Sequence, residues 1–170
     1  RTMRWDDTGW DYVQSSPSMP NFVTALHYPG SCMLEGVYLS EGRGTSLPFQ
    51  TVGTPYIDGD SLAENLNTQN IAGVRFRPHA FLPTTSIYAD ETCYGVQLHI
   101  TDVEHFEPIR AWLATIIEIK AMYPEQFEWL SPNQREYERG SQWHFDRLMG
   151  SKKYRQMIDS GASVDDVMDG

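Results

Sequence analysis

Apolar and polar side chains alternate with a period of two in two stretches of the chain. Residues 73–81 show this alternation, and residues 94–101 show it again. A period of two is typical of half-buried β-strands. Pro78 favours a sheet edge or a strand end, because proline has no N–H to donate to a neighbouring strand. A third strand is expected within residues 49–57, interrupted at Gly53-Thr54-Pro55.

A helical period is clearest in residues 107–123, where apolar side chains recur at a spacing close to 3.6 residues. Pro124 follows directly and closes this helix, since proline cannot continue it. Shorter helices are expected at residues 21–27, 60–67, 142–149 and 152–159, with a final turn near the carboxy terminus.

Local signals set the expected ends of the first of these helices. Asn21 can cap its start, because an asparagine side chain accepts hydrogen bonds from the first free amides of a helix. Pro29-Gly30 is expected to end it. Before it, residues 15–20 are rich in serine and proline, which predicts an extended linker.

The order of these elements predicts an α+β fold. We expect a mixed sheet with packed helices, strands mainly in the first half and helices mainly in the second. The chain has 170 residues, of which 40% are hydrophobic, so it can form one domain with a core of its own. Charged residues make up 21%, an ordinary level for a soluble fold that argues against global disorder.

Charge and cysteine content narrow the classes of partner and site. The net charge of −10 argues against a nucleic-acid partner or an anionic membrane surface. No apolar run has membrane length and no signal peptide is recognised, so no membrane-spanning segment is expected. Cys32 and Cys93 are too few for a disulfide scaffold, and either pair or remain separate thiols. The five histidines are scattered, so we predict neither a metal site nor a cofactor.

Residues 31–45 have an unusual composition, with two apolar triplets, two acids, one arginine and several glycines. Gly36, Gly42 and Gly44 allow positive φ angles and close approach of other groups. Such a composition is unusual for a loop on the protein surface. It predicts buried backbone that presents polar groups into a cavity.

Glu35 and Glu41 are the candidate catalytic residues of this segment. Glycoside hydrolysis commonly uses two carboxyl groups, roughly 5–10 Å apart. Each of these glutamates directly precedes a glycine in mostly apolar surroundings, and a buried carboxyl can act as a general acid. The alternative is structural, with the glutamates capping backbone amides or pairing with Arg43.

Arg43, between two glycines, is a candidate for binding a ligand carboxylate through two parallel hydrogen bonds. Its alternative role is an ion pair that fixes the loop. Thr45 either offers a hydroxyl to a ligand or closes the turn.

Other candidate binding groups lie on the predicted strands. His99 is followed by Asp102, and such a pair can orient a proton-transfer group, although a histidine in this position is more often structural. Arg75 lies with Arg77 and His79 on a basic face, which is either solvated or a wall for an anionic sugar substituent. Aromatic residues, 12% of the chain, either pack in the core or stack on sugar rings.

Several blocks occur in one order along nearly the whole chain: Ser16-Pro17-Ser18-Met19-Pro20, residues 28–36, Leu39-Ser40-Glu41-Gly42-Arg43-Gly44-Thr45 followed by Pro48-Phe49, and residues 53–57, 73–78, 95–102 and 145–151. In these blocks the chain resembles the NamZ-like exo-β-N-acetylmuramidase family, long catalogued as a domain of unknown function. The block from Ser40 to Thr45 is the specific one. Ser31 and Val37 depart from the family pattern, in which threonine and a polar residue are expected.

The resemblance implies a glycosidase that removes N-acetylmuramic acid from the non-reducing ends of peptidoglycan fragments, and a periplasmic or secreted location. It implies that residues 1–170 are a single carboxy-terminal domain, and that a Rossmann-like amino-terminal domain, absent from this chain, completes the cleft. That domain would carry the leading catalytic glutamate, so the isolated chain is expected to be inactive.

The resemblance also changes the expected roles of the site residues. Glu35 and Glu41 become supporting or substrate-orienting acids, and Arg43 becomes a partner for the lactyl carboxylate of muramic acid. The further substrate-binding positions are Ser40, Thr45, Tyr28, Arg75 and His99. Two other classes stay open, a non-catalytic carbohydrate-binding domain and a structural domain that has lost the chemistry.

Overall fold

The computed structural model describes residues 5–132 and 142–170. At its centre is a three-stranded sheet in the order β1-β3-β2, built from β1 (Thr51–Thr54), β2 (Val74–Phe81) and β3 (Cys93–Ile100). The three predicted strands are therefore all present, and the α+β class is confirmed.

The sheet is antiparallel at both pairings, and not mixed as expected. β2 and β3 follow one another along the chain and pair as neighbours, which favours the antiparallel direction. β1 and β2 run in the same direction and are connected through α2 (Gly59–Thr68), but β3 lies between them. The arrangement is a split β-α-β unit.

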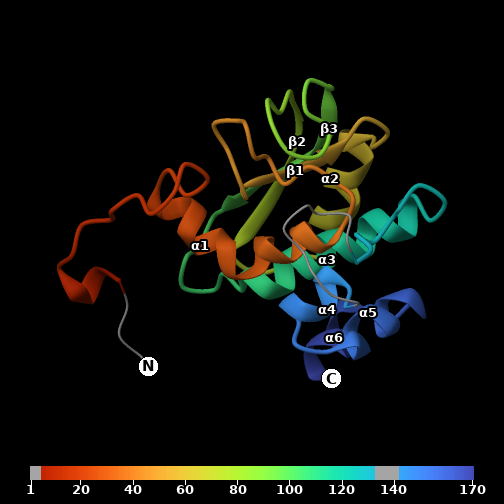
Figure 1. The fold of residues 1–170 in the computed structure, drawn as a ribbon. Coiled ribbons are helices and arrows are strands. Elements are labelled where there is room, and N and C mark those ends of the chain that lie inside the picture. The colour runs from red at the N-terminus through yellow and green to blue at the C-terminus, as the bar shows by residue number, and fades with distance from the viewer. Residues whose placement is uncertain (1–4, 133–141) are drawn as a thin grey trace.

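The described residues form five further helices: α1 (Phe22–Ser31), α3 (Pro108–Met122), α4 (His144–Leu148), α5 (Lys152–Asp159) and α6 (Val164–Asp169). Two short 3-10 helices, η1 (Asp6–Thr8) and η2 (Cys32–Gly36), complete the described elements. In Figure 1, α1 and α3 lie side by side below the sheet, and α4, α5 and α6 gather near the carboxy terminus. The segment before α1 extends away from this body as an arm.

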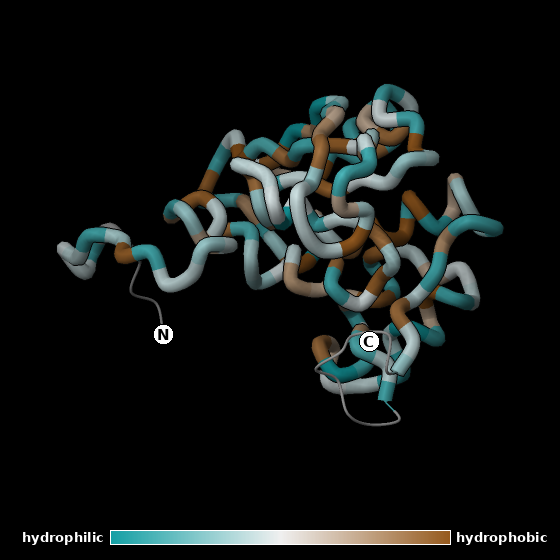
Figure 2. The backbone as a smooth tube through the Cα atoms, turned by 45° about the horizontal axis from the view of Figure 1, so that its top comes forward, coloured by the Kyte–Doolittle hydropathy of each residue, from teal (hydrophilic) through white to brown (hydrophobic). Residues whose placement is uncertain are grey.

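The core forms where the inward face of the sheet meets α3. Phe76, Val96 and Leu98 point into it from the strands, and Trp112 and Ile116 point into it from α3. In Figure 2, hydrophobic residues recur throughout the body, whereas the arm before α1 consists mainly of hydrophilic and neutral residues. Within residues 5–132 and 142–170, no helix has the length and apolar character needed to cross a membrane.

α1 begins as predicted but ends later. The Asn21 side chain accepts a hydrogen bond from the backbone amide of Thr24 at 2.9 Å, which confirms the cap. The helix then continues through Pro29 and Gly30 and passes into η2. Gly30 lies against the start of α3, where an added Cβ would come within 2.0 Å of the Pro108 carbonyl oxygen. The glycine therefore allows two helices to approach closely, and this packing overrides the local stop signal.

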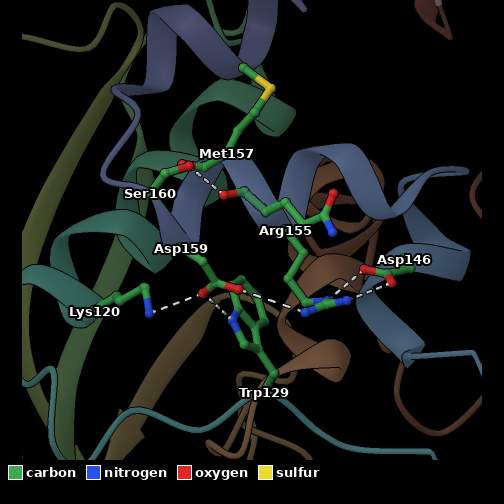
Figure 3. A network of polar contacts seen from close by, with 8 residues as sticks. Lys120, Trp129, Asp146, Arg155, Met157, Asp159 and Ser160 are labelled. Carbon is green, nitrogen blue, oxygen red and sulfur yellow. Dashed lines mark hydrogen bonds and ion pairs between the residues drawn. The ribbon is translucent and has the colours of Figure 1, made fainter.

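An ion-pair network attaches the carboxy-terminal helices to the rest of the fold (Figure 3). Arg155 of α5 donates two hydrogen bonds to the Asp146 carboxylate of α4, at 2.7 and 3.0 Å. Asp159 accepts a hydrogen bond from the Trp129 indole at 2.8 Å and pairs with Lys120 of α3 at 3.1 Å.

Both cysteines are free thiols. Cys93 is buried at the start of β3, and Cys32 is partly buried at the start of η2. Of the two alternatives that the sequence leaves open, the structure has the unpaired one.

Candidate functional site

The segment with the unusual composition is connected to the fold by two isolated β-bridges, one between Val37 and Trp129 and one between Ser40 and Gly53. The Tyr38 amide donates to the Glu128 carbonyl at 2.8 Å, and Ser40 and Gly53 exchange two backbone hydrogen bonds of 3.0 Å. Residues 39–41 are buried. The prediction of buried backbone in this segment is confirmed.

A tight turn follows, and its own hydroxyl groups stabilise it. The Thr45 amide and hydroxyl both donate to the Gly42 carbonyl, at 3.1 and 2.6 Å. The Gly42 amide donates to the Ser40 hydroxyl at 3.4 Å. Gly42 and Gly44 have φ angles of 80° and 79°, a backbone region that favours glycine. This geometry supports the turn-closing alternative for Thr45.

Arg43 bridges the two candidate acids. One terminal nitrogen donates to the Glu41 carboxylate and the other donates to the Glu35 carboxylate. The Glu41 side chain has no exposed surface, whereas 12% of Glu35 and 26% of Arg43 is exposed. Glu35, Glu41 and Arg43 form the Arg43 cluster, in which the guanidinium is the most exposed group and Glu41 lies beneath it. The ion pair that was the alternative role for Arg43 is present.

The charges of the cluster stabilise one another. Burial alone would lower the pKa of Arg43, but the carboxylates of Glu41 and Glu35 outweigh it and raise the pKa above its ordinary value. The second oxygen of Glu41 is buried and finds no hydrogen-bond partner within the described residues. On the far side of Glu35, the His144 Nε2 atom of α4 lies 3.6 Å from its second oxygen.

Phe49 forms the floor beneath the cation. The Arg43 guanidinium carbon lies 4.7 Å from the centre of the Phe49 ring, and the Tyr28 ring meets the same ring edge-on at 4.9 Å. Phe49 has a φ angle of 62°, which is rare for a bulky side chain. Such backbone strain, about 1–3 kcal/mol, persists only where the surroundings enforce it, and it is frequent at functional sites.

Tyr28 reaches the cluster from α1. Its ring is 37% exposed, and burial, followed by the charge of Glu35, raises the pKa of its hydroxyl. The structure therefore brings together four predicted site residues from three elements: Tyr28, Glu35, Glu41 and Arg43. Sequence reasoning assigned no role to Phe49 or to His144. No local pattern signals a left-handed phenylalanine, and His144 lies far from Glu35 along the chain.

Arg75 and His99 lie elsewhere. They face one another across β2 and β3 and line a hollow of about 470 Å³ against α2, in a set of lining residues that includes none of the cluster. For His99 the contacts favour the structural alternative over a pair with Asp102: Asp102 contacts the His105 ring at 2.8 Å, because both lie in the loop after β3. His99 accepts instead from Arg77 at 3.4 Å.

The comparisons with known proteins point to one family. Residues 26–170 match the family model described as exo-beta-N-acetylmuramidase NamZ, C-terminal. Over 168 residues the chain is 40% identical to the peptidoglycan beta-N-acetylmuramidase NamZ of Bacillus subtilis (strain 168). This match covers 99% of this chain and 38% of the B. subtilis protein.

Two crystal structures of DUF1343 family proteins from Bacteroides fragilis NCTC 9343 are similar in fold. One is 31% identical with a TM-score of 0.83, and the match covers 99% of this chain and 43% of the other. The second is 25% identical with a TM-score of 0.56, covering 91% of this chain and 37% of the other. The chain thus spans about two fifths of the length of these relatives.

Proposed function

The chain belongs to the NamZ exo-β-N-acetylmuramidase family, whose carboxy-terminal part it matches, and we propose that it forms one wall of a glycosidase active site. In the full-length protein, an amino-terminal domain would complete the cleft. The proposed reaction releases N-acetylmuramic acid from the non-reducing ends of peptidoglycan fragments. Because peptidoglycan lies outside the cytoplasmic membrane, we also propose a periplasmic or secreted location.

One observation carries this proposal: Arg43 is fixed by two carboxylates over the Phe49 ring, within the segment most specific to the family. A guanidinium has five N–H donors, and the two glutamates engage only part of them. The remaining donors of Arg43, which is partly exposed, are available to the lactyl carboxylate of muramic acid.

The two acids then have different roles. Glu41 is sealed beneath the guanidinium, so it positions Arg43 and does not itself reach the sugar. Glu35 is also largely buried, but 12% of its side chain is exposed and it lies near His144 and Tyr28, so we assign it to the substrate side. The lactyl carboxylate of the substrate would be a third carboxylate beside those of Glu35 and Glu41. Because the like charges repel one another, its binding is favoured if a proton is taken up at the same time.

The test uses full-length protein and the disaccharide N-acetylmuramyl-N-acetylglucosamine, with chromatographic detection of free N-acetylmuramic acid. We expect release by the wild type and a fall in kcat/KM on the order of a hundredfold for Arg43→Ala, as for the loss of one partner of a desolvated ion pair. Glu35→Gln is expected to lower kcat. Arg110→Ala, which removes ion pairs to Glu107 and Asp165, is the matched control and should retain activity.

Two results would count against the proposal. Without any muramic acid release by the wild type, the proposed activity is wrong, and sugar binding without turnover would favour a carbohydrate-binding domain. Release at wild-type rates by both Arg43→Ala and Glu35→Gln would show that the substrate contacts lie elsewhere.

A further inference from the structure

Backbone strain gathers at two segments that touch one another. Within the described residues, the non-glycine positions with positive φ are Phe49, Asn70, Ser86, Tyr88 and Asp90, with angles of 51° to 73°. Phe49 belongs to the candidate site, and three others lie in the loop of residues 82–92 between β2 and β3. Non-glycine residues with strained backbone cluster at binding and catalytic sites, so this loop is a candidate part of a binding site.

The loop is attached to the site segment at two points. The Thr84 hydroxyl donates to the Gly44 carbonyl at 2.9 Å. Farther along the loop, the Tyr88 ring meets the Tyr38 ring edge-on, with ring centres 5.5 Å apart. Tyr38 precedes Glu41 by three residues, so their Cα atoms are at most roughly 10 Å apart. Tyr38 therefore lies in the same short segment as Glu41 and Arg43, and the loop that carries Tyr88 also contacts Gly44, the residue after Arg43.

The surroundings of the pair suit a neutral sugar. Tyr38 is 38% exposed and Tyr88 is half-buried, so part of the pair is open to solvent. The backbone carbonyl of the exposed residue Glu128 accepts a hydrogen bond from the Tyr38 amide. Burial raises the pKa of the Tyr88 hydroxyl most, followed by two nearby tyrosines, Cys93 and last the Glu128 carboxylate. Aromatic rings accept the apolar face of a pyranose, and a nearby carboxylate can accept hydrogen bonds from its hydroxyls.

We propose that Tyr38 and Tyr88 form a stacking subsite for a neutral N-acetylhexosamine, the sugar that follows the residue held at Arg43. The order of the two sugars rests on the proposed function, but the stacking itself does not. The observation that favours a binding role is the exposure of Tyr38, which is 38% open to solvent although its ring packs against Tyr88.

The experiment combines kinetics with equilibrium binding on full-length protein. The two substrates are N-acetylmuramyl-N-acetylglucosamine and methyl N-acetyl-β-muramide, which has no second sugar. Tyr38→Ala and Tyr88→Ala should lower kcat/KM for the disaccharide about tenfold, as expected for loss of ring stacking, and change the methyl glycoside less than twofold. Tyr38→Phe keeps the ring and should retain the wild-type ratio. Tyr94→Ala, which removes an exposed tyrosine of β3, is the control.

Calorimetric titration with N,N′-diacetylchitobiose, a neutral disaccharide, separates the two proposals. Binding that is weakened by Tyr38→Ala or Tyr88→Ala, but not by Tyr94→Ala, supports the subsite even if no muramic acid is released. Unchanged chitobiose binding, together with equal losses on both substrates in folded variants, would overturn it.

Discussion

The Arg43 guanidinium lies over the Phe49 ring, with its central carbon 4.7 Å from the ring centre. The Phe49 amide donates a hydrogen bond to the Glu41 carbonyl at 2.7 Å. The phenylalanine beneath the guanidinium is thus hydrogen-bonded to the backbone of Glu41, whose carboxylate pairs with Arg43. One short loop therefore fixes the position of the cation, its aromatic floor and one of its carboxylates. This is the geometry of a preorganised polar group, which binds a ligand without a further ordering cost.

Arg43→Lys should disrupt this cluster although it keeps the charge. A lysine ammonium is a point donor and cannot hold Glu35 and Glu41 with the two arms of a planar fork. We expect kcat/KM of the full-length protein to fall at least tenfold, and the free energy of unfolding to fall by about 1–3 kcal/mol, because a buried carboxylate loses a hydrogen bond. Activity assays and urea unfolding measure the two effects.

Arg110→Lys is the matched control, since Arg110 forms ion pairs at the surface. Its expected effect on stability is below about 1 kcal/mol. If Arg43→Lys behaves like this control in both assays, the bridge that Arg43 forms between Glu35 and Glu41 contributes to neither activity nor stability.

The sequence was sufficient to find the segment but not its internal geometry. Glu35, Glu41 and Arg43 were predicted together because acids, an arginine and glycines in apolar surroundings are unusual at short range. The left-handed backbone of Phe49 and the approach of His144 were not predicted, since both depend on contacts formed only in the fold. Tertiary packing also decided where α1 ends, because Gly30 allows α1 to lie close against the start of α3.

Gly30→Ala tests that crossing. The new methyl group would lie 2.0 Å from the Pro108 carbonyl oxygen and 2.8 Å from the Ile109 amide nitrogen, both backbone atoms that cannot rotate away. We expect α1 and α3 to separate locally and the free energy of unfolding to fall by about 1–3 kcal/mol, measured by urea unfolding. Val23→Ala on the exposed side of the same helix should change stability by less than about 0.5 kcal/mol. Equal effects would show that the helices do not cross at Gly30.

His27 should make the fold sensitive to acid. It is fully buried against the rings of Phe106 and Trp112, and burial, with the charge of His99, lowers its pKa from 6.5 to about 4. As the pH falls, His27 becomes protonated in the unfolded chain near pH 6.5 but in the folded protein only near pH 4. The free energy of unfolding is therefore unaffected by His27 above pH 6.5 and decreases as the pH falls toward 4. This one group should account for a loss of about 2–3 kcal/mol between pH 7.5 and 4.5.

The measurement is urea unfolding of the wild type and His27→Phe at both pH values. The phenylalanine variant should lose less stability on acidification, by that difference, because the other titrating groups are common to both proteins. His105→Gln removes an exposed histidine and should follow the wild type. Parallel pH profiles for wild type and His27→Phe would show that His27 does not titrate in this range.

The Asp146–Arg155 pair should be the ion pair that holds the carboxy-terminal helices. Asp146 is 2% exposed and accepts two hydrogen bonds from Arg155, so removing one partner leaves the other charge in a desolvated position. Asp146→Asn should lower the free energy of unfolding by about 3 kcal/mol, and Arg155→Met by a similar amount. Lys120→Met removes a more exposed pair with Asp159 and should have an effect below about 1 kcal/mol. In the double variant the losses should not add, because both substitutions break the same interaction. Additive losses would instead mean that each residue stabilises the fold through separate contacts.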